Sequence, residues 1–200
     1  MVEVSLNIHG VKMTAERFPR LGEGRVRVEY GDTLGVYFPV KGVGEINGVR
    51  EFFSTPVEFA EKVFEGFEGD VKKILIANFL ALVKYALGLE DDVIALVKLG
   101  DRIVAYLYGT KVQEIRVRKV GGSVFEVHAG GGLVGRLKVY KKKRGVAVEC
   151  EGEEEFVEAV RDLEYYYAKS IDVSPERFVF DAARAYLLSS VRKSCATSLR

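Results

Sequence analysis

Hydrophobic and polar residues alternate along many stretches of this chain, and a period of two predicts β-strands. In the segment RVRVEY (25–30), Val26, Val28 and Tyr30 share one face of a strand, while arginine and glutamate occupy the other. Similar patterns predict strands near 2–8, 11–18, 25–30, 34–40 and 48–53 in the first half of the chain. In the second half they predict strands near 93–99, 102–108, 112–120, 123–129, 133–141 and 145–150.

Two pairs of helices are expected, one pair after each run of strands. Ser54-Thr55-Pro56 supplies an N-cap and a first-turn proline for a helix that starts at residue 56. A second helix extends from Asp70 to about Leu87 and ends at Gly88. It is apolar almost all round, which predicts that other elements cover it on several sides. The second pair is predicted over 153–169 and 175–193.

The chain also aligns with itself at an offset of about 97 to 99 residues. Arg17 then falls on Arg116, and Glu58-Phe59 falls on Glu155-Phe156. The matches keep their order over most of both halves, although a chain rich in Val, Gly and Glu also produces matches by chance. We therefore predict an α+β protein with an internal duplication. Each half is an antiparallel meander of four or five strands followed by two helices, and the second half begins with an additional strand at 93–99.

The two halves are expected at residues 1–90 and 93–200, related by a pseudo-two-fold axis. No linker rich in Pro, Ser or Gly separates them, since only the short segment EDD (90–92) intervenes. The halves are therefore expected to pack as one body.

Composition changes this picture only locally. The chain has 30 Lys and Arg against 29 Asp and Glu, so its net charge of +1 gives no general attraction for nucleic acid or membranes. Residues 101–150, however, hold 11 basic residues against 4 acidic ones. Amide side chains are scarce and charged residues make up 30%, a composition typical of hyperthermophiles. The basic charge thus gathers on the strands of the second half.

The apolar segments do not suggest a membrane protein. The most apolar stretch, 74–89, contains Asn78 and Lys84 and is too short to span a bilayer. The N-terminus lacks the basic and apolar regions of a signal peptide. We therefore expect an intracellular, cytoplasmic protein without a membrane partner.

Candidate catalytic or metal-binding groups are few. His9 and His128 are the only histidines, and each aligns with a tyrosine in the other half. Cys150 and Cys195 lack metal-site spacing. The acidic clusters at 90–92 and 151–155 suit a loop and a helix N-terminus, respectively. We therefore expect no enzyme, no metal and no cofactor.

A glycine-rich stretch also invites a cofactor interpretation. Gly130, Gly132 and Gly135 match the spacing G-x-G-x-x-G of dinucleotide-binding loops. Such a loop must be followed by a helix, whereas the segment GRLKVYKKK (135–143) alternates like a strand. The glycines therefore predict a β-turn or bulge.

The strongest functional pattern is a basic and aromatic strand face. In IRVRKV (115–120), arginines alternate with aliphatic residues, and GRLKVYKKK repeats the pattern with lysine and tyrosine. Cations that follow phosphates and rings that stack on bases are typical of single-strand binding. The alternative is that this face is polar only because it meets solvent, as the exposed face of an antiparallel sheet must be. The candidate nucleic-acid-binding residues are Arg116, Arg118, Lys119, Arg136, Lys138, Tyr140 and Lys142, together with Arg25, Arg27 and Tyr37 of the first half.

The assignment of Tyr37 to the outward face requires Val36, Phe38 and Val40 to point inward.

In architecture, a tandem of antiparallel meanders and helices resembles the PUR and Whirly proteins, which build curved sheets from duplicated units and bind single-stranded DNA or RNA. None of their motifs is present, and each half here has two helices rather than one. The resemblance implies a nucleic-acid-binding protein, consistent with the basic strand face.

The alternative is a non-catalytic assembly module that forms a homodimer or docks a partner. Its contacts would come from the apolar helices and from Tyr165-Tyr166-Tyr167. Three consecutive helical positions point three ways, so at least one of these rings is expected at the surface. Partial burial where two helices meet is the other interpretation of these tyrosines.

Overall fold

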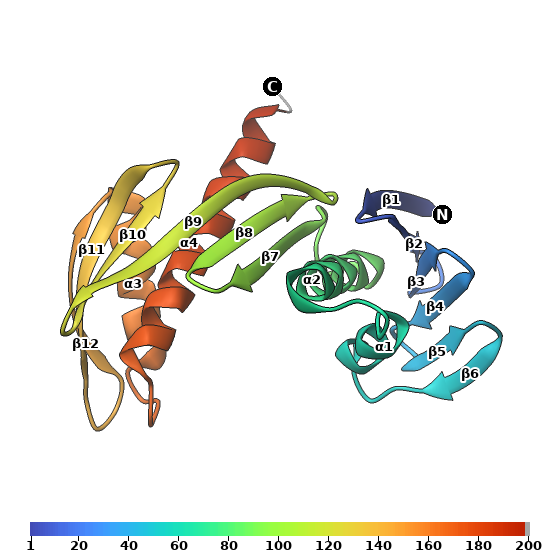
Figure 1. Ribbon diagram of the computed structural model, residues 1–200, viewed down its shortest axis with the longest axis horizontal. Helices are drawn as coiled ribbons and strands as arrows, with labels where there is room; N and C mark the ends of the chain where they lie inside the picture. Colours follow the sequence, from blue (N-terminus) through green and yellow to red (C-terminus); the bar gives the residue numbers. More distant parts are fainter. Residues whose placement is uncertain (199–200) are drawn as a thin grey trace. The chain divides into compact units, whose positions relative to one another are not determined.

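A computed structural model describes residues 1–198 and shows an α+β protein (Figure 1). Within these residues the chain forms two six-stranded antiparallel sheets and four helices. It separates into two compact units, one of residues 1–97 and 106–111, the other of residues 98–105 and the chain from 112 onward. The α+β class is therefore as predicted, whereas the pseudo-two-fold relation stays a prediction.

Each sheet is a simple meander in which neighbours along the chain are neighbours in the sheet. The first contains β1 (Val2–Ile8), β2 (Val11–Phe18), β3 (Glu23–Tyr30), β4 (Thr33–Phe38), β5 (Val43–Ile46) and β6 (Val49–Phe52). The second contains β7 (Ile94–Leu99), β8 (Arg102–Leu107), β9 (Thr110–Gly121), β10 (Val124–Ala129), β11 (Gly132–Lys141) and β12 (Val146–Gly152). The helices are α1 (Pro56–Val63), α2 (Gly69–Ala86), α3 (Glu154–Tyr167) and α4 (Pro175–Ser198).

Six strands in each sheet correct the prediction of four or five. In the first sheet the sequence misses β5, whose four residues VGEI show no clear alternation. Gly44 at its second position faces α1, and an added Cβ there would lie 2.6 Å from Cε2 of Phe59. Gly44 thus interrupts the alternation that would predict β5, and its missing side chain allows α1 to pack against that strand.

The core of the first unit is aromatic and lies between the sheet and the two helices. Tyr37 of β4 stacks on Phe59 of α1 with ring centroids 5.1 Å apart, and Phe59 stacks on Phe79 of α2 at 5.4 Å. Phe59 and Phe79 are fully buried. Such pairs add about 0.5–1.5 kcal/mol beyond the area that they bury.

The orientation of β4 contradicts the sequence prediction. Gly35 and Tyr37 face the helices, while Val36 and Phe38 lie on the opposite face of the sheet, and Val40 is exposed. The physical reason is space, because a Cβ at position 35 would lie 2.8 Å from Cγ2 of Val63 in α1. Only glycine fits under the helix, and this fixes the alternation of the whole strand.

The second unit packs α3 and α4 against β11 and β12. Phe156 of α3 is fully buried and lies over Gly135 of β11, where an added Cβ would come within 2.5 Å of its ring. The buried side of α4 includes Phe178, Leu187 and Val191. Along β9 and β11 the opposite face is exposed and holds Arg116, Arg118, Arg136, Lys138 and Tyr140 of the predicted binding surface.

Candidate nucleic-acid interface

The outward face of the second sheet follows the predicted alternation. On β9, Ile115 and Val117 are buried while Arg116 and Arg118 are exposed. On β11, Leu137 and Val139 are buried, and Arg136, Lys138 and Tyr140 face outward. Tyr140 is 46% exposed, so its ring is accessible to a ligand.

Acidic residues of the neighbouring strands interrupt this basic face. Strand pairing places Arg118 opposite Glu126, Glu126 opposite Arg136, and Arg136 opposite Glu151. Arg136 donates a hydrogen bond from Nη2 to Oε1 of Glu126 at 2.6 Å. The charges therefore alternate across the sheet, and the basic excess of residues 101–150 is partly neutralised in space.

Glu126 is the centre of a small charged network. Besides Arg136, it contacts Nε2 of His128 through Oε2 at 3.0 Å. The hydrogen bond from Arg136 and the one from His128 lower the pKa of Glu126. Arg136 and His128 are thereby held against a carboxylate, which reduces what they can offer to an anionic ligand.

Lys119 does not belong to the outward face. It lies directly opposite Phe125, whose side chain is buried, and its Nζ is 5.9 Å from the centre of that ring. Because side chains alternate along a strand, a residue that follows the outward Arg118 faces the core side of the sheet. Its ammonium reaches solvent near the end of β9, away from the outward face that carries Arg116 and Arg118.

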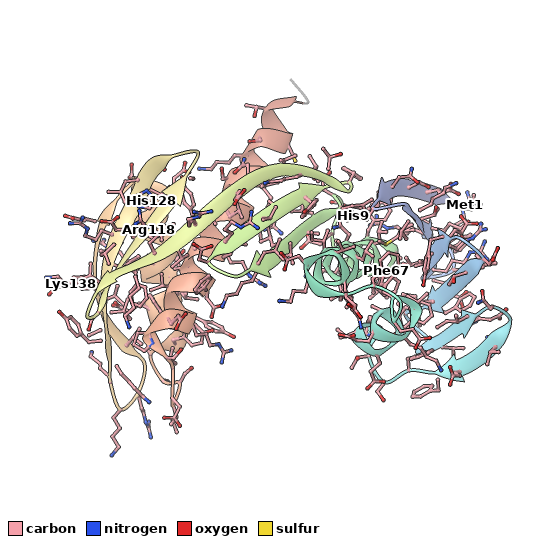
Figure 2. All side chains as sticks on the ribbon, viewed as in Figure 1. Met1, His9, Phe67, Arg118, His128 and Lys138 are labelled. Carbon is pink, nitrogen blue, oxygen red and sulfur yellow. The ribbon has the colours of Figure 1, made fainter. Side chains whose placement is uncertain are left out.

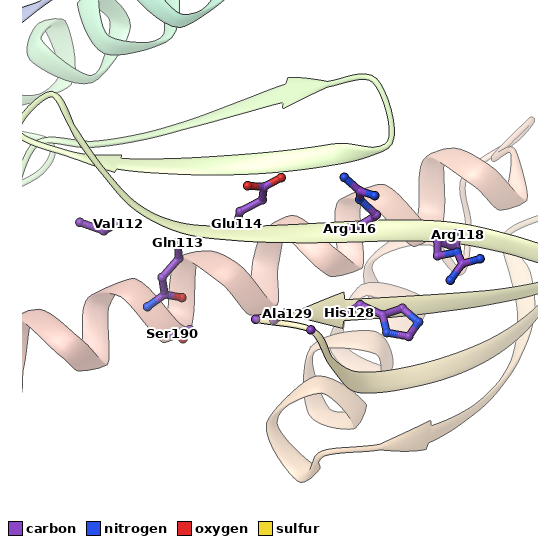
Figure 3. Close-up of a pocket in the computed structure, with 10 residues that line it drawn as sticks. Val112, Gln113, Glu114, Arg116, Arg118, His128, Ala129 and Ser190 are labelled. Carbon is purple, nitrogen blue, oxygen red and sulfur yellow. The ribbon is translucent and has the colours of Figure 1, made fainter.

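A concavity in the second unit lies beside β9 (Figure 3). It is an open groove of about 880 Å³, within the size range of small-ligand sites. Its walls come from β9, from the β10–β11 turn and from α4. The lining residues are Val112, Gln113, Glu114, Arg116, Arg118, His128, Ala129, Gly130, Gly131 and Ser190.

The cations of this groove are two guanidinium groups, and its lining carboxylate, that of Glu114, pairs with Arg102 at 3.0 Å. Arg116 Nε is 3.6 Å from Oδ2 of Asp101, and both side chains are about half exposed. Arg118 has no ion pair within the described chain, although Glu126 lies opposite it in the sheet. Exposed ion pairs contribute only about 0–1 kcal/mol, so neither arginine is strongly held away from a ligand.

The other predicted residues of the second half lie elsewhere. Figure 2 shows Lys138 well separated from Arg118 and His128. Lys138 lies opposite Val124 of β10 and Glu149 of β12. Lys142 follows β11 in the β11–β12 turn. The structure therefore joins Arg116 and Arg118 in one groove but distributes the remaining cations over the rest of the unit.

The first unit offers a different surface from the one predicted. Arg25 forms two hydrogen bonds with the carboxylate of the buried Glu16, and Arg27 pairs with Glu29 at 3.4 Å. The hydrogen bond from Arg25 lowers the pKa of Glu16, so this pair is charged at neutral pH. Tyr37, only 2% exposed, is part of the core and cannot stack on a base.

Two lining features of the groove escaped the sequence prediction. They are His128 and the glycines Gly130 and Gly131, to which the sequence pattern assigns no binding role. The glycines do form the β10–β11 turn, with φ of +58° at Gly130 and +80° at Gly131. An added Cβ would meet nothing within 4 Å at either position, so this turn leaves open space for a ligand.

No family model, curated protein or solved structure matches the chain. No helix in the part of the chain that the structure describes is both long and apolar enough to cross a membrane. Among residues 1–198, no three His, Cys, Asp or Glu side chains are grouped as metal ligands would be.

Proposed function

We propose that this protein binds single-stranded nucleic acid without catalysing a reaction on it. The observation that carries the proposal is the groove beside β9, in which Arg116 and Arg118 lie two residues apart on one face of a strand. Arginine is suited to phosphate because its planar fork donates two parallel hydrogen bonds. Lys138 and Tyr140 of β11 extend the surface beyond the groove, and Arg136 contributes less because Glu126 holds it.

Binding of this kind is expected to be weakly sequence-specific and strongly salt-dependent. Phosphate contacts release counterions, and for single strands the slope of log K against log salt is about −0.7 per contact. Two arginines therefore account for a slope of about −1.4. The interrupted charge pattern of the sheet face favours modest affinity and restricts tight phosphate contacts to the groove.

The experiment is fluorescence anisotropy with a labelled single-stranded oligonucleotide and its duplex, at several salt concentrations. Arg116→Gln/Arg118→Gln should weaken single-strand binding at least tenfold and flatten the salt slope by about 1.4. Arg20→Gln/Arg50→Gln removes the same charge from exposed positions of the first unit and should leave affinity nearly unchanged. Equal binding by the Arg116/Arg118 variant and the wild type would refute the proposed site.

A homodimeric assembly module is the second candidate, and one observation favours it. Tyr165 and Tyr166 at the end of α3 are 87% and 75% exposed, an unusual state for two neighbouring aromatic residues. Light scattering of the wild type over a range of concentrations separates the two ideas. A dimer that dissociates on Tyr165→Ala/Tyr166→Ala would support assembly, whereas a monomer throughout would dispose of it.

We also infer that the two halves arose by duplication. The β1–β2 and β8–β9 turns are supporting observations, since His9-Gly10 and Tyr108-Gly109 have φ values of +49° and +76°, and +47° and +80°. In each half, a phenylalanine of the first helix (Phe59 or Phe156) packs against a glycine of the sheet. Arg17, which aligns with Arg116, donates its hydrogen bonds to the carbonyls of Tyr85 and Glu90, so we assign the binding function to the second half alone.

A further inference from the structure

The β11–β12 turn and the α3–α4 connection lie at the same end of the second unit (Figure 1). The amide of Gly145 donates to the carbonyl of Ser170 at 2.8 Å, and Lys141 Nζ is 3.6 Å from Oδ1 of Asp172. A Cβ at Gly145 would lie 3.0 Å from the carbonyl oxygen of Tyr167, so the turn is packed directly against the end of α3. Two segments that are distant in sequence thus form one surface.

This surface, which we call the tyrosine–lysine tip, combines exposed cations with exposed apolar groups. The cations are Lys141, Lys142, Lys143, Arg144 and Lys169, and the nearby acid of the two loops is Asp172. Apart from Lys141, these cations make no ion pair within the described residues. Tyr165, Tyr166 and Ile171 are 87%, 75% and 70% exposed at its edge.

One of the three tyrosines anchors the end of α3 to α4. Tyr167 donates a hydrogen bond from its hydroxyl to Oδ2 of Asp181 in α4 at 2.7 Å. Its ring then contacts that of Tyr166 edge to face, with centroids 5.1 Å apart. The end of α3, which presents Tyr165 and Tyr166 to solvent, is thus anchored to α4, and an ordered helix end loses less conformational freedom when a ligand binds.

We propose that the tyrosine–lysine tip is a second contact site for single-stranded nucleic acid, at which Tyr165 and Tyr166 stack on unpaired bases. The proposal rests on the nucleic-acid function above and supplies what the groove lacks. The groove contains cations but no aromatic ring other than His128, and Tyr37 is in the core of the other unit. Phosphate contacts alone do not distinguish single strands from duplexes, whereas stacking requires unpaired bases.

The charge at the tip favours this partner over a neutral one. Several cations without ion pairs next to two accessible rings are the combination that sequence-tolerant single-strand binding uses. A lipid surface with anionic headgroups would attract the same cations, and Ile171 would then insert between the lipids. Insertion into lipid needs a larger apolar face than the exposed Ile171 supplies, so we assign the tip to nucleic acid.

The test uses the full chain and the oligonucleotides described above. Tyr165→Ala/Tyr166→Ala should weaken single-strand binding at least tenfold and leave duplex binding within about twofold, because only single strands offer bases for stacking. Tyr165→Phe/Tyr166→Phe keeps the rings and should bind like the wild type. If the alanine variant binds single strands as tightly as the wild type, the tip is not a stacking site.

A charge variant completes the design. Lys142→Gln/Lys143→Gln/Arg144→Gln should flatten the single-strand salt slope by about 2. The control Lys12→Gln/Arg20→Gln/Lys73→Gln makes the same charge change on exposed positions of the first unit and should not alter the slope. Should only the Arg116/Arg118 variant lose affinity, the groove stands and the tip proposal fails. If neither the wild type nor any variant binds an oligonucleotide, both proposals fail.

The lipid alternative has its own outcome. Vesicles of phosphatidylglycerol and phosphatidylcholine are sedimented with the wild type and with the tip variants. Wild-type sedimentation that is lost in the tip variants, together with unchanged oligonucleotide binding by those variants, would overturn the proposal in favour of a membrane surface. A wild type that does not sediment with these vesicles supports the nucleic-acid assignment.

Discussion

The contact between Gly135 and Phe156 allows a stability test with a predictable size. An added Cβ at position 135 would lie 2.5 Å from Cε1 of Phe156 and 3.0 Å from the carbonyl oxygen of Glu151. Carbon atoms in contact normally lie about 3.5–4.0 Å apart, so the overlap is about 1 Å. Phe156 is fully buried and packs edge to face against Tyr186 at 5.8 Å, which limits its retreat. Gly135→Ala should therefore lower the free energy of unfolding by about 1–3 kcal/mol.

A double-mutant cycle isolates the clash from other effects of alanine. Phe156→Ala alone should cost about 3–5 kcal/mol, because it leaves a cavity in the core. With the ring removed, the methyl group introduced at position 135 has room, so the double variant should cost about 1–3 kcal/mol less than the sum of the two single variants. A coupling of this sign is the signature of direct steric contact.

The assay is urea unfolding followed by far-UV circular dichroism, with amide hydrogen exchange to assign the loss to the second unit. Exchange is needed because a chain of two compact units need not unfold in one step. Gly66→Ala is the control, since a Cβ there meets nothing within 4 Å, and it should change stability by less than about 0.5 kcal/mol. Additive costs in the cycle, or a Gly135→Ala protein as stable as the wild type, would refute the reasoning.

Two other predictions concern the first unit. Arg17 donates from Nε to the carbonyl of Tyr85 at 2.8 Å and from Nη2 to the carbonyl of Glu90 at 2.7 Å. Lysine lacks the planar guanidinium group that makes both bonds. Arg17→Lys should therefore lower the free energy of unfolding, measured by urea titration, by about 1–3 kcal/mol. The pKa of Glu16 in the folded protein lies below its ordinary value of 4.5. The ionised carboxylate therefore stabilises the fold at pH values above 4.5. This contribution is lost as the pH falls through the pKa of the folded state. Wild type should therefore exceed Glu16→Gln in stability at neutral pH, and the two should converge in acid; a difference that stays constant as the pH is lowered would contradict this.

The sequence predicted most helices and strands because their signals are local. The cap at Thr55 with Pro56 places the start of α1 where it is found, and Thr55 Oγ1 accepts a hydrogen bond from the amide of Glu58. Ser174 does the same for α4 through the amide of Arg177. Such signals involve residues three apart and need no knowledge of the tertiary fold.

Strand orientation could not be read with the same success, because it depends on the partner helix. Both faces of β4 are apolar in sequence, so alternation alone allows either Tyr37 or Phe38 to point inward. The choice is made by Val63 and Phe59 of α1, which leave room only for a glycine at position 35. Tyr37 therefore lies in the core rather than on the predicted binding face, because α1, which follows the strand in sequence, packs against Gly35.

Charge counts along the chain overstate the basic character of the second sheet, because ion pairs form across strands. Glu126 lies between Arg118 and Arg136 in the sheet although it is eight and ten residues away in sequence. Pairing with Arg136 removes one cation from the candidate surface, whereas Arg118 keeps its place in the groove. The position of each acid across the sheet, rather than the total charge, thus determines which cations can meet a phosphate. The same reasoning supports the tyrosine–lysine tip. There Asp172 pairs with Lys141, while the exposed cations that follow in the turn make no ion pair within the described residues.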